Sequence, residues 1–293
     1  MTLSLPKPLV STAWLAEHLH DPDLRIVDVG YLPPERTKTG REHFARHRIP
    51  GAQFFDVDDI ADTTVAKKHA FPPADVFSDK VGALGIGNGH RVVAYDRMGG
   101  IAAAARAWFL FRAFGHENVS VLAGGWTAWE KEGRPTEKNA AAVPARQSFD
   151  ARKQDGFVRS RSEVHSNLTE KRFQVLDSRA APNFAGTEMD NWPGLRLGHI
   201  PGSRNLSALD LFDLTAMLFK SPDQMRALFS KAGVDLSKPL TASGASGITP
   251  CTIALAGYII GKTDVQIYDG SWVDWCADPS LPIETGPPRP VSL

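Results

Sequence analysis

An internal repeat constrains the fold of this chain more than any other feature of its sequence. The runs Leu24–Gly30 and Phe173–Arg179 lie about 150 residues apart; both are short and apolar, and both lead into an aspartate. Further along each half, Gly124–Trp129 recurs as Gly270–Trp275, with the first glycine and both tryptophans kept in place. A repeat of this length predicts two domains of the same architecture.

Within each repeat, strand-like runs alternate with helix-like runs. In the first, Arg91–Tyr95 precedes an alanine-rich helix predicted roughly over Ile101–Phe114. In the second, Pro239–Ala242 precedes a helix predicted roughly over Ile248–Ile260. Short strands that alternate with helices form a mostly parallel sheet covered on both faces. The sequence therefore predicts an α/β fold.

The boundary between the repeats is predicted from composition. The stretch 131–155 is rich in Pro, Ala and charged residues and has neither a helical nor a strand period, as is typical of a linker. We expect one domain over 1–138, a linker over 139–155 and a second domain over 156–293.

A helix is also predicted near the start of each domain. Thr12–Leu19 and Glu163–Leu168 have helical character, and a serine suited to capping precedes each of them. We therefore expect Ser11 and Ser162 at the N-cap positions.

Charge and composition exclude several classes of function. The chain has 33 Lys and Arg residues and 33 Asp and Glu residues, so no overall basic field exists to hold nucleic acid or an anionic membrane. No apolar run approaches the roughly 18 residues of a membrane helix, and the N-terminal segment has no targeting character. We expect a cytoplasmic protein. Its two cysteines and nine histidines match no metal-ligand spacing, so neither a metal nor another cofactor is expected.

The order of the motifs resembles the two-domain rhodanese family, which includes thiosulfate and 3-mercaptopyruvate sulfurtransferases. The matching motifs are Arg48–Ala52, Phe114–His116 and Leu122–Trp126 in the first repeat, and Leu176–Arg179, Gly198–Gly202, Gly247–Thr249 and Tyr268–Trp272 in the second. The resemblance covers nearly the whole chain. It implies two tandem rhodanese-like domains, each a mostly parallel sheet flanked by helices, with the chemistry in the second.

The resemblance also implies a reaction. In that family a cysteine begins a Cys-x-x-Gly-Val-Thr loop between a strand and a helix. Backbone N–H groups that converge on this loop lower the pKa of a thiol, and they stabilise the thiolate and its persulfide. Sulfane sulfur from a small anionic donor, 3-mercaptopyruvate or thiosulfate, then passes through the persulfide to a thiol or cyanide.

In this chain a glycine occupies the position of that cysteine. Alignment on Gly247–Thr249 places the nucleophile position at Gly244. Two explanations stay open: the cysteine was replaced by engineering, or catalysis was lost naturally while an anion-binding loop was kept. An alignment on Ser243 needs a longer loop and leaves the serine without a matched base. The other loop residues expected to bind substrate are Ala245, Ser246, Gly247, Ile248 and Thr249.

Two functions follow from this loop. The leading prediction is a sulfurtransferase that is active when the loop carries cysteine and inactive with Gly244. The alternative is a catalytically silent rhodanese-like module that binds a small anion or a partner protein. Cys251 is expected to be a buried structural residue in either case.

Residues outside the loop are assigned from the resemblance. Arg179 is expected to pair with the substrate anion. Mercaptopyruvate enzymes carry a second arginine at a place that falls here on Trp192 or nearby, so Arg196 is the substitute candidate. His47 and Arg48 are further candidates to reach the loop.

The neighbouring motifs are expected to support the site. His199 is predicted to be a turn residue. Asp269 and Ser271 are expected to shape one wall of the loop. The equivalent loop of the first repeat, Asp96–Gly100, contains no cysteine and puts Arg97 opposite Gly244, so the first domain is predicted to be silent.

Overall fold

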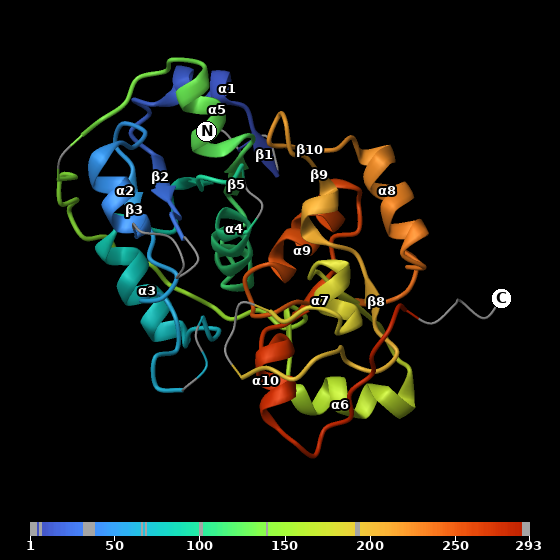
Figure 1. Ribbon diagram of the computed structural model, residues 1–293. Helices are drawn as coiled ribbons and strands as arrows, with labels where there is room; N and C mark the ends of the chain where they lie inside the picture. The colour runs from blue at the N-terminus through green and yellow to red at the C-terminus, as the bar shows by residue number, and fades with distance from the viewer. Residues whose placement is uncertain are drawn as a thin grey trace. The chain divides into compact units, whose positions relative to one another are not determined.

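The computed structural model of this chain divides into two compact units. It describes residues 5, 8–31, 39–65, 67, 69–99, 102–138, 140–190 and 194–288. The first unit comprises Met1–Thr64, Phe71–Gln154 and Leu214–Leu218, and the second comprises Val65–Ala70, Asp155–Asp213 and Phe219–Leu293. Figure 1 labels the helices and strands of both units.

The first unit contains a parallel five-stranded sheet of order β1-β5-β4-β2-β3. Its strands are β1 (Leu9–Val10), β2 (Leu24–Asp28), β3 (Gln53–Phe54), β4 (Arg91–Tyr95) and β5 (Val119–Leu122). Every residue of β4 and β5 is buried, as expected for inner strands of a parallel sheet covered on both faces.

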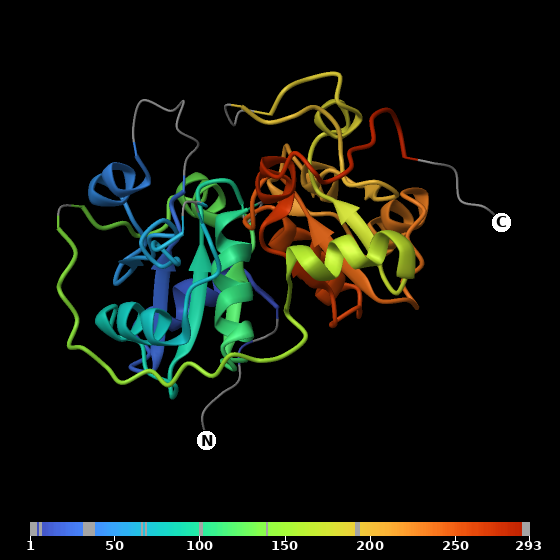
Figure 2. The same cartoon turned by 90° about the horizontal axis from the view of Figure 1, so that it is seen from below.

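Helices cover both faces of this sheet. They are α1 (Thr12–His18), α2 (Gly40–Arg46), α3 (Ala74–Ala83), α4 (Ala103–Ala113) and α5 (Gly125–Lys131). Helix α4 is buried along its whole length and packs on β4 and β5, beside which it runs in Figure 2. Its small alanine side chains allow this close approach to the sheet.

The second unit repeats the same topology. Its parallel sheet has the order β6-β12-β11-β7-β8. The strands are β6 (Val158–Arg159), β7 (Gln174–Asp177), β8 (Arg204–Asn205), β11 (Leu240–Ser243) and β12 (Gln266–Tyr268). Strand for strand, this order matches the first sheet. The predicted tandem of α/β domains is confirmed.

The helices of the second unit also follow the repeat. They are α6 (Arg161–Glu170), α7 (Ala181–Ala185), α8 (Pro222–Lys231), α9 (Pro250–Ile259) and α10 (Ser271–Ala277), with a 3₁₀ turn η1 (Ala208–Leu211) and a two-stranded sheet of β9 (Phe212–Asp213) and β10 (Leu218–Phe219). No helix in the described ranges is long and apolar enough to cross a bilayer.

One of the two predicted N-caps is correct. Ser11 Oγ accepts a hydrogen bond from Trp14 N at the start of α1. The prediction for Ser162 is wrong, because α6 begins two residues earlier than expected and Ser160 caps it. Ser160 and Glu163 form a reciprocal capping box, a tighter arrangement than a lone serine provides.

The stretch predicted as a linker packs closely on the first unit. Gln147 N donates to Gly82 O at 3.0 Å. Phe149 is buried and lies edge-on to Phe77 and Phe111, at ring centroid distances of 5.7 and 5.9 Å. Residues before Asp155 thus take part in the core of the first unit, whereas the domain boundaries themselves stay a prediction.

Candidate active site

The loop between β11 and α9, residues 244–249, lies at the carboxyl end of the second sheet. Strand β11 pairs with β7 on one side and with β12 on the other. All three strands are parallel, so the residues that follow them meet at one edge. Ser178 and Asp269, which come directly after β7 and β12, therefore lie beside the loop. This edge is where α/β sheets commonly bind ligands.

Helix α10 holds the first half of the 244–249 loop. Gly244 N donates to Ser271 Oγ at 3.2 Å. In return, Trp272 N donates to Gly244 O at 2.9 Å and Val273 N donates to Ala245 O at 3.0 Å. These bonds satisfy amides of the first turn of α10, which would otherwise lack intrahelical partners. The loop is thus fixed by backbone contacts that do not depend on the side chain at position 244.

Several loop amides point to an anion site. Among the described residues, the amides of Ala245, Ser246, Ile248 and Thr249 donate to no protein acceptor. The loop also leads directly into the N-terminus of α9, where aligned peptide dipoles leave a partial positive charge. Consecutive unpaired amides before a helix form a typical binding site for a small anion.

Two hydroxyl groups lie beside Gly244. A Cβ built on this glycine would be 2.6 Å from both Ser178 Oγ and Thr249 Oγ1, and 3.0 Å from Pro250 Cδ. The backbone of Gly244 does not have the left-handed φ that favours glycine. A side chain at this position would therefore be too close to neighbouring side chains, whereas the backbone conformation would accept it.

The two thiols of the chain lie elsewhere. Cys251 is fully buried in the first turn of α9, where its Sγ donates to Gly247 O at 3.2 Å. Its predicted burial is confirmed. Cys276 lies near the end of α10, and burial raises the pKa of its thiol. A buried thiol with a raised pKa is a poor nucleophile.

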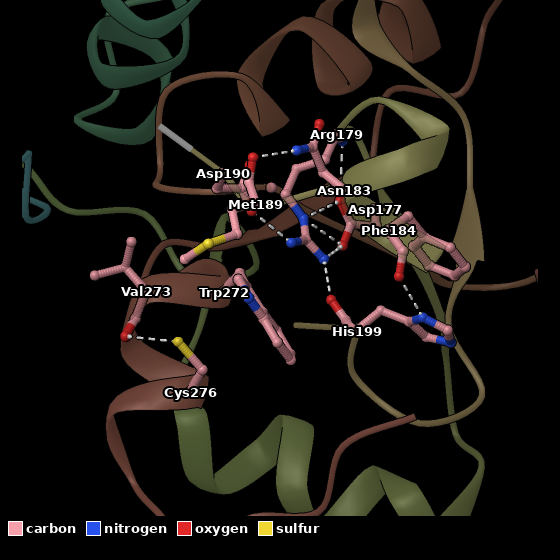
Figure 3. A network of polar contacts seen from close by, with 12 residues as sticks. Asp177, Arg179, Asn183, Phe184, Met189, Asp190, His199, Trp272, Val273 and Cys276 are labelled. Atoms are coloured by element: carbon pink, nitrogen blue, oxygen red, sulfur yellow. Dashed lines mark hydrogen bonds and ion pairs between the residues drawn. The ribbon is translucent and has the colours of Figure 1, made fainter. Parts of the chain in front are cut away.

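Arg179 forms a buried ionic network next to the loop. Figure 3 shows its guanidinium with Asp177 on one side and Asp190 on the other. It donates to Asp177 through Nε and Nη2, to Asp190 at 2.7 Å through Nη1, and to the Gly198 carbonyl at 2.8 Å. The ring of Trp272 lies 4.8 Å from it. Burial disfavours the cation, but both carboxylates outweigh this effect and raise the pKa of Arg179.

This network commits most N–H groups of Arg179 to protein acceptors. Its side chain is only 3% exposed. A substrate anion would have to use the remaining N–H of Nη1 or displace Asp190. The predicted role of Arg179 in substrate binding stays a prediction. Its observed contacts join the end of β7 to Asp190 and to the Gly198 carbonyl.

Arg196 stabilises the far end of α10. Its guanidinium donates to the carbonyl groups of Cys276, Asp278 and Leu281, at 3.0, 2.7 and 3.4 Å. A cation that binds the last carbonyls of a helix is a common C-terminal cap. These contacts engage the guanidinium of Arg196. Its predicted role in substrate binding stays a prediction. Trp192 lies outside the described residues.

His199 has the structural setting of a turn histidine. Its ring is stacked on Phe184, with centroids 3.7 Å apart, and its Nδ1 is 2.8 Å from the Phe184 carbonyl oxygen. Burial lowers the pKa of His199, so the ring is neutral near pH 7.

The first repeat builds a similar network with a different arginine. Arg97, from the loop after β4, donates to Asp28 Oδ2 at 3.1 Å and to the His47 carbonyl at 2.7 Å, and lies 4.7 Å from the Trp126 ring. In the second repeat the matching residues are Asp177 and Trp272, and both contact Arg179. The side chain at the position that matches Gly244 is thus held by Asp28 and the His47 carbonyl, and the predicted silence of the first domain stays a prediction.

His47 and Arg48 both belong to the first compact unit. Arg48 is 3% exposed; it pairs with Glu137 at 3.2 Å and lies over the Phe44 ring at 5.1 Å. His47 is exposed. Arg48 thus has a structural place in its own unit, and the predicted reach of either residue to the loop stays a prediction.

Sequence reasoning missed two residues of the site. Ser178 lies inside the Leu176–Arg179 motif of the second repeat, so its position after β7 could have drawn attention. Lys67 lies in Val65–Ala70, a segment of the second unit that precedes the rest of this unit by many residues in the chain. Its Nζ lies 2.7 Å from Asp269 Oδ2. No local pattern could have shown this pairing. The described residues contain no cluster of His, Cys, Asp or Glu suited to hold a metal.

Comparisons with known proteins cover both repeats. The rhodanese-like domain family matches residues 11–132 and 160–278. The chain is 41% identical to 3-mercaptopyruvate sulfurtransferase of Homo sapiens over 276 residues, and 43% identical to thiosulfate sulfurtransferase of Cricetulus griseus over 279 residues. Each alignment covers 92% of both chains. The crystal structure of SseA from Escherichia coli, described as a 3-mercaptopyruvate sulfotransferase, matches with a TM-score of 0.82 and 32% identity, covering 90% of this chain and 98% of SseA. The chain therefore belongs to the two-domain rhodanese family of sulfurtransferases.

Proposed function

We propose that the 244–249 loop is a sulfurtransferase active site in which Gly244 stands at the nucleophile position. In this form the loop binds a small anionic sulfur donor such as 3-mercaptopyruvate or thiosulfate without forming a persulfide. The observation that carries the proposal is the set of unpaired loop amides around a residue that has no thiol.

The missing step is defined by the chemistry of sulfur transfer. A thiolate attacks the outer sulfur of thiosulfate, and sulfite leaves with the electron pair of the broken S–S bond. The enzyme then carries a persulfide, whose outer sulfur is taken by cyanide or a thiol, and the thiolate is regenerated. Gly244 has no atom that can form this bond. The hydroxyls of Ser178 and Thr249 do not replace it, because no histidine base contacts them among the described residues.

Anion binding does not need the missing thiol. The loop amides are part of the backbone, and contacts from α10 hold them in place. The relatives named above act on 3-mercaptopyruvate or thiosulfate according to their names, and both compounds are anions of a size that such a loop accepts.

A second candidate function is active sulfur transfer by a form with cysteine at position 244. It is favoured by the backbone of Gly244, which has a conformation open to any residue. The codon for position 244 in the natural gene decides between the two candidates: a cysteine codon means that the natural protein is an active sulfurtransferase.

Two measurements test the proposal on the chain as given. Isothermal titration with thiosulfate is expected to show one site per chain, and mass spectrometry after donor treatment is expected to show no added sulfur. A persulfide on Cys251 or Cys276, lost when that cysteine is changed to serine, would contradict the absence of a nucleophile. No binding at millimolar thiosulfate would contradict the anion site.

A further inference from the structure

Ser271, the first residue of α10, has a backbone conformation that serine rarely adopts. Its φ is +54°, in the left-handed region that favours glycine, and the residue is fully buried. The matching residue of the first repeat is Gly125, whose φ is +51°. The same turn is therefore made by glycine in one repeat and by serine in the other. Strained residues persist where their surroundings hold them in place, and they gather at functional sites.

The two repeats differ in the side chain that this turn carries. A Cβ built on Gly125 would collide with the Asp96 carbonyl oxygen in the loop of the first repeat. In the second repeat the side chain is present, and its hydroxyl is hydrogen-bonded to the 244–249 loop. The strained conformation of Ser271 thus coincides with a contact that glycine in the first repeat cannot make.

The Ser271 hydroxyl contacts the 244–249 loop at two points. It accepts a hydrogen bond from Gly244 N at 3.2 Å. Its own proton has two acceptors within reach, the Ser246 carbonyl oxygen at 3.1 Å and the Tyr268 carbonyl oxygen at 2.9 Å. One hydroxyl therefore connects the first half of the loop with the end of β12.

These contacts decide which way the loop amides point. The carbonyl groups of Gly244 and Ala245 accept hydrogen bonds from the first turn of α10. The next carbonyl, that of Ser246, lies beside the Ser271 hydroxyl. In a planar trans peptide, the N–H points opposite to the preceding carbonyl group. The amides of Ala245 and Ser246 therefore point away from α10, and neither donates to a protein acceptor among the described residues, so both are available to an anion.

We propose that Ser271 is a positioning residue of the active site, whose strained conformation brings its hydroxyl to the loop and so directs the loop amides toward the bound anion. This inference rests on the proposed function. Ser271 does not touch the anion; it acts through Gly244 and Ser246. Without the hydroxyl, the Gly244 amide and the Ser246 carbonyl lose this partner, and their peptide groups can turn. We expect the dissociation constant for a small anion to rise about tenfold, the equivalent of one hydrogen bond to a charged group.

Two substitutions at Ser271 separate backbone strain from positioning, with thiosulfate as the probe. Ser271→Ala and Ser271→Gly both remove the hydroxyl, so both should raise the dissociation constant about tenfold. Their stabilities should differ, because only glycine relieves the left-handed φ. We expect urea denaturation to give a higher midpoint for Ser271→Gly than for Ser271→Ala. If the residue served stability alone, the affinity would follow the midpoint, and the glycine variant would bind thiosulfate more tightly than the alanine variant.

The matched control is Ser203→Ala in the same unit. Ser203 is also buried, and its hydroxyl donates to the Ile200 carbonyl oxygen at 2.7 Å. Within the described part of the chain, the hydrogen bonds of Ser203 stay inside its own turn. The control therefore removes a buried serine hydroxyl that does not contact the 244–249 loop, and it should leave the dissociation constant unchanged.

A second readout does not depend on thiosulfate binding. In a Gly244→Cys background, Ser271→Ala is expected to raise the pKa of the new thiol by about one unit, because the thiolate is itself an anion that the oriented amides stabilise. Rates of alkylation by iodoacetamide across pH, followed by mass spectrometry of the peptide around position 244, measure this pKa. If the parent binds no thiosulfate but the thiol pKa rises, the anion-binding function fails and the role of Ser271 stands.

Three outcomes overturn the inference. In the first, Ser271→Ala changes neither the thiosulfate affinity nor the thiol pKa. In the second, Ser271→Gly binds thiosulfate as tightly as the parent, which would mean that the backbone of the turn orients the loop without the hydroxyl. In the third, the midpoint of Ser271→Gly is no higher than that of Ser271→Ala, which would show that the conformation of Ser271 is not strained.

Discussion

The Ser178 hydroxyl donates a hydrogen bond of 3.1 Å to the Thr249 hydroxyl, in the space that a side chain at Gly244 would enter. Ser178 follows β7 and Thr249 precedes α9, so the bond joins two separate elements at the edge of the sheet. A cysteine at position 244 must turn both hydroxyls aside. Each can do so by rotation about a single χ1 angle, without movement of the backbone.

We expect Gly244→Cys to create sulfurtransferase activity. The new thiol would lie before the N-terminus of α9 among unpaired amides, a setting that lowers a thiol pKa by about one unit or more. Mass spectrometry should show one added sulfur on Cys at position 244 after donor treatment, and steady-state kinetics should be ping-pong. Because Ala245 and Ser246 are not basic, 3-mercaptopyruvate is expected to be a better donor than thiosulfate. A folded variant whose thiol has a pKa of about 8.5 and accepts no sulfur would show that the loop amides do not lower the pKa of a thiol at this position.

The hydroxyl pair should limit the stability of that variant. Gly244→Cys places Cβ 2.6 Å from each hydroxyl oxygen, so we expect a loss of about 1–3 kcal/mol in the free energy of unfolding. Adding Ser178→Ala removes one close contact and should restore part of this loss. Urea denaturation of the two variants, with Ser178→Ala alone as the control, measures the effect. If Gly244→Cys and the double variant with Ser178→Ala lose the same free energy of unfolding, the Ser178 hydroxyl moves aside without an energetic cost.

Arg179 is expected to be a major determinant of stability. Arg179→Ala leaves Asp177 and Asp190 without the cation that joins them, and breaking a buried pair in this way costs about 3–5 kcal/mol. The matched control is Arg152→Ala, whose exposed pair with Asp150 should contribute less than about 1 kcal/mol. Urea denaturation compares them. A loss for Arg179→Ala no larger than that for Arg152→Ala would show that the buried network is not formed in solution.

Asp28 should make the stability of the first unit depend on pH. Burial raises the pKa of Asp28 to about 6, although the nearby Arg97 acts in the opposite direction. The folded state therefore favours the protonated acid. This contribution to stability is fully present below the unfolded pKa of about 3.9, and it is lost as pH rises through 6.

The magnitude of this loss can be measured against Asp28→Asn. From pH 4 to pH 7, the parent should lose about 2 kcal/mol in the free energy of unfolding relative to the variant, whose amide does not titrate. Urea denaturation at intervals of pH gives the two curves. Curves that stay parallel over this range would mean that Asp28 titrates normally in the folded protein.

Much of this protein could be predicted from local sequence pattern. Short apolar runs, helical runs and turn glycines carry their own conformational preferences, so the two α/β repeats and the position of the 244–249 loop follow from residues that are neighbours in the chain. The assignment of Gly244 to the nucleophile position also comes from chain neighbours, because Gly247–Thr249 lie within the same loop, and it stays a prediction.

What only the tertiary structure decided is which side chains meet across the sheet. Arg97, from the loop after β4, pairs with Asp28 at the end of β2, whereas the matching aspartate of the second repeat, Asp177, pairs with an arginine only two residues later in the chain. Lys67 reaches Asp269 from a distant segment. Such contacts depend on the packing of separate elements, which brings together charges that no local pattern connects; burial then sets how strongly those charges act.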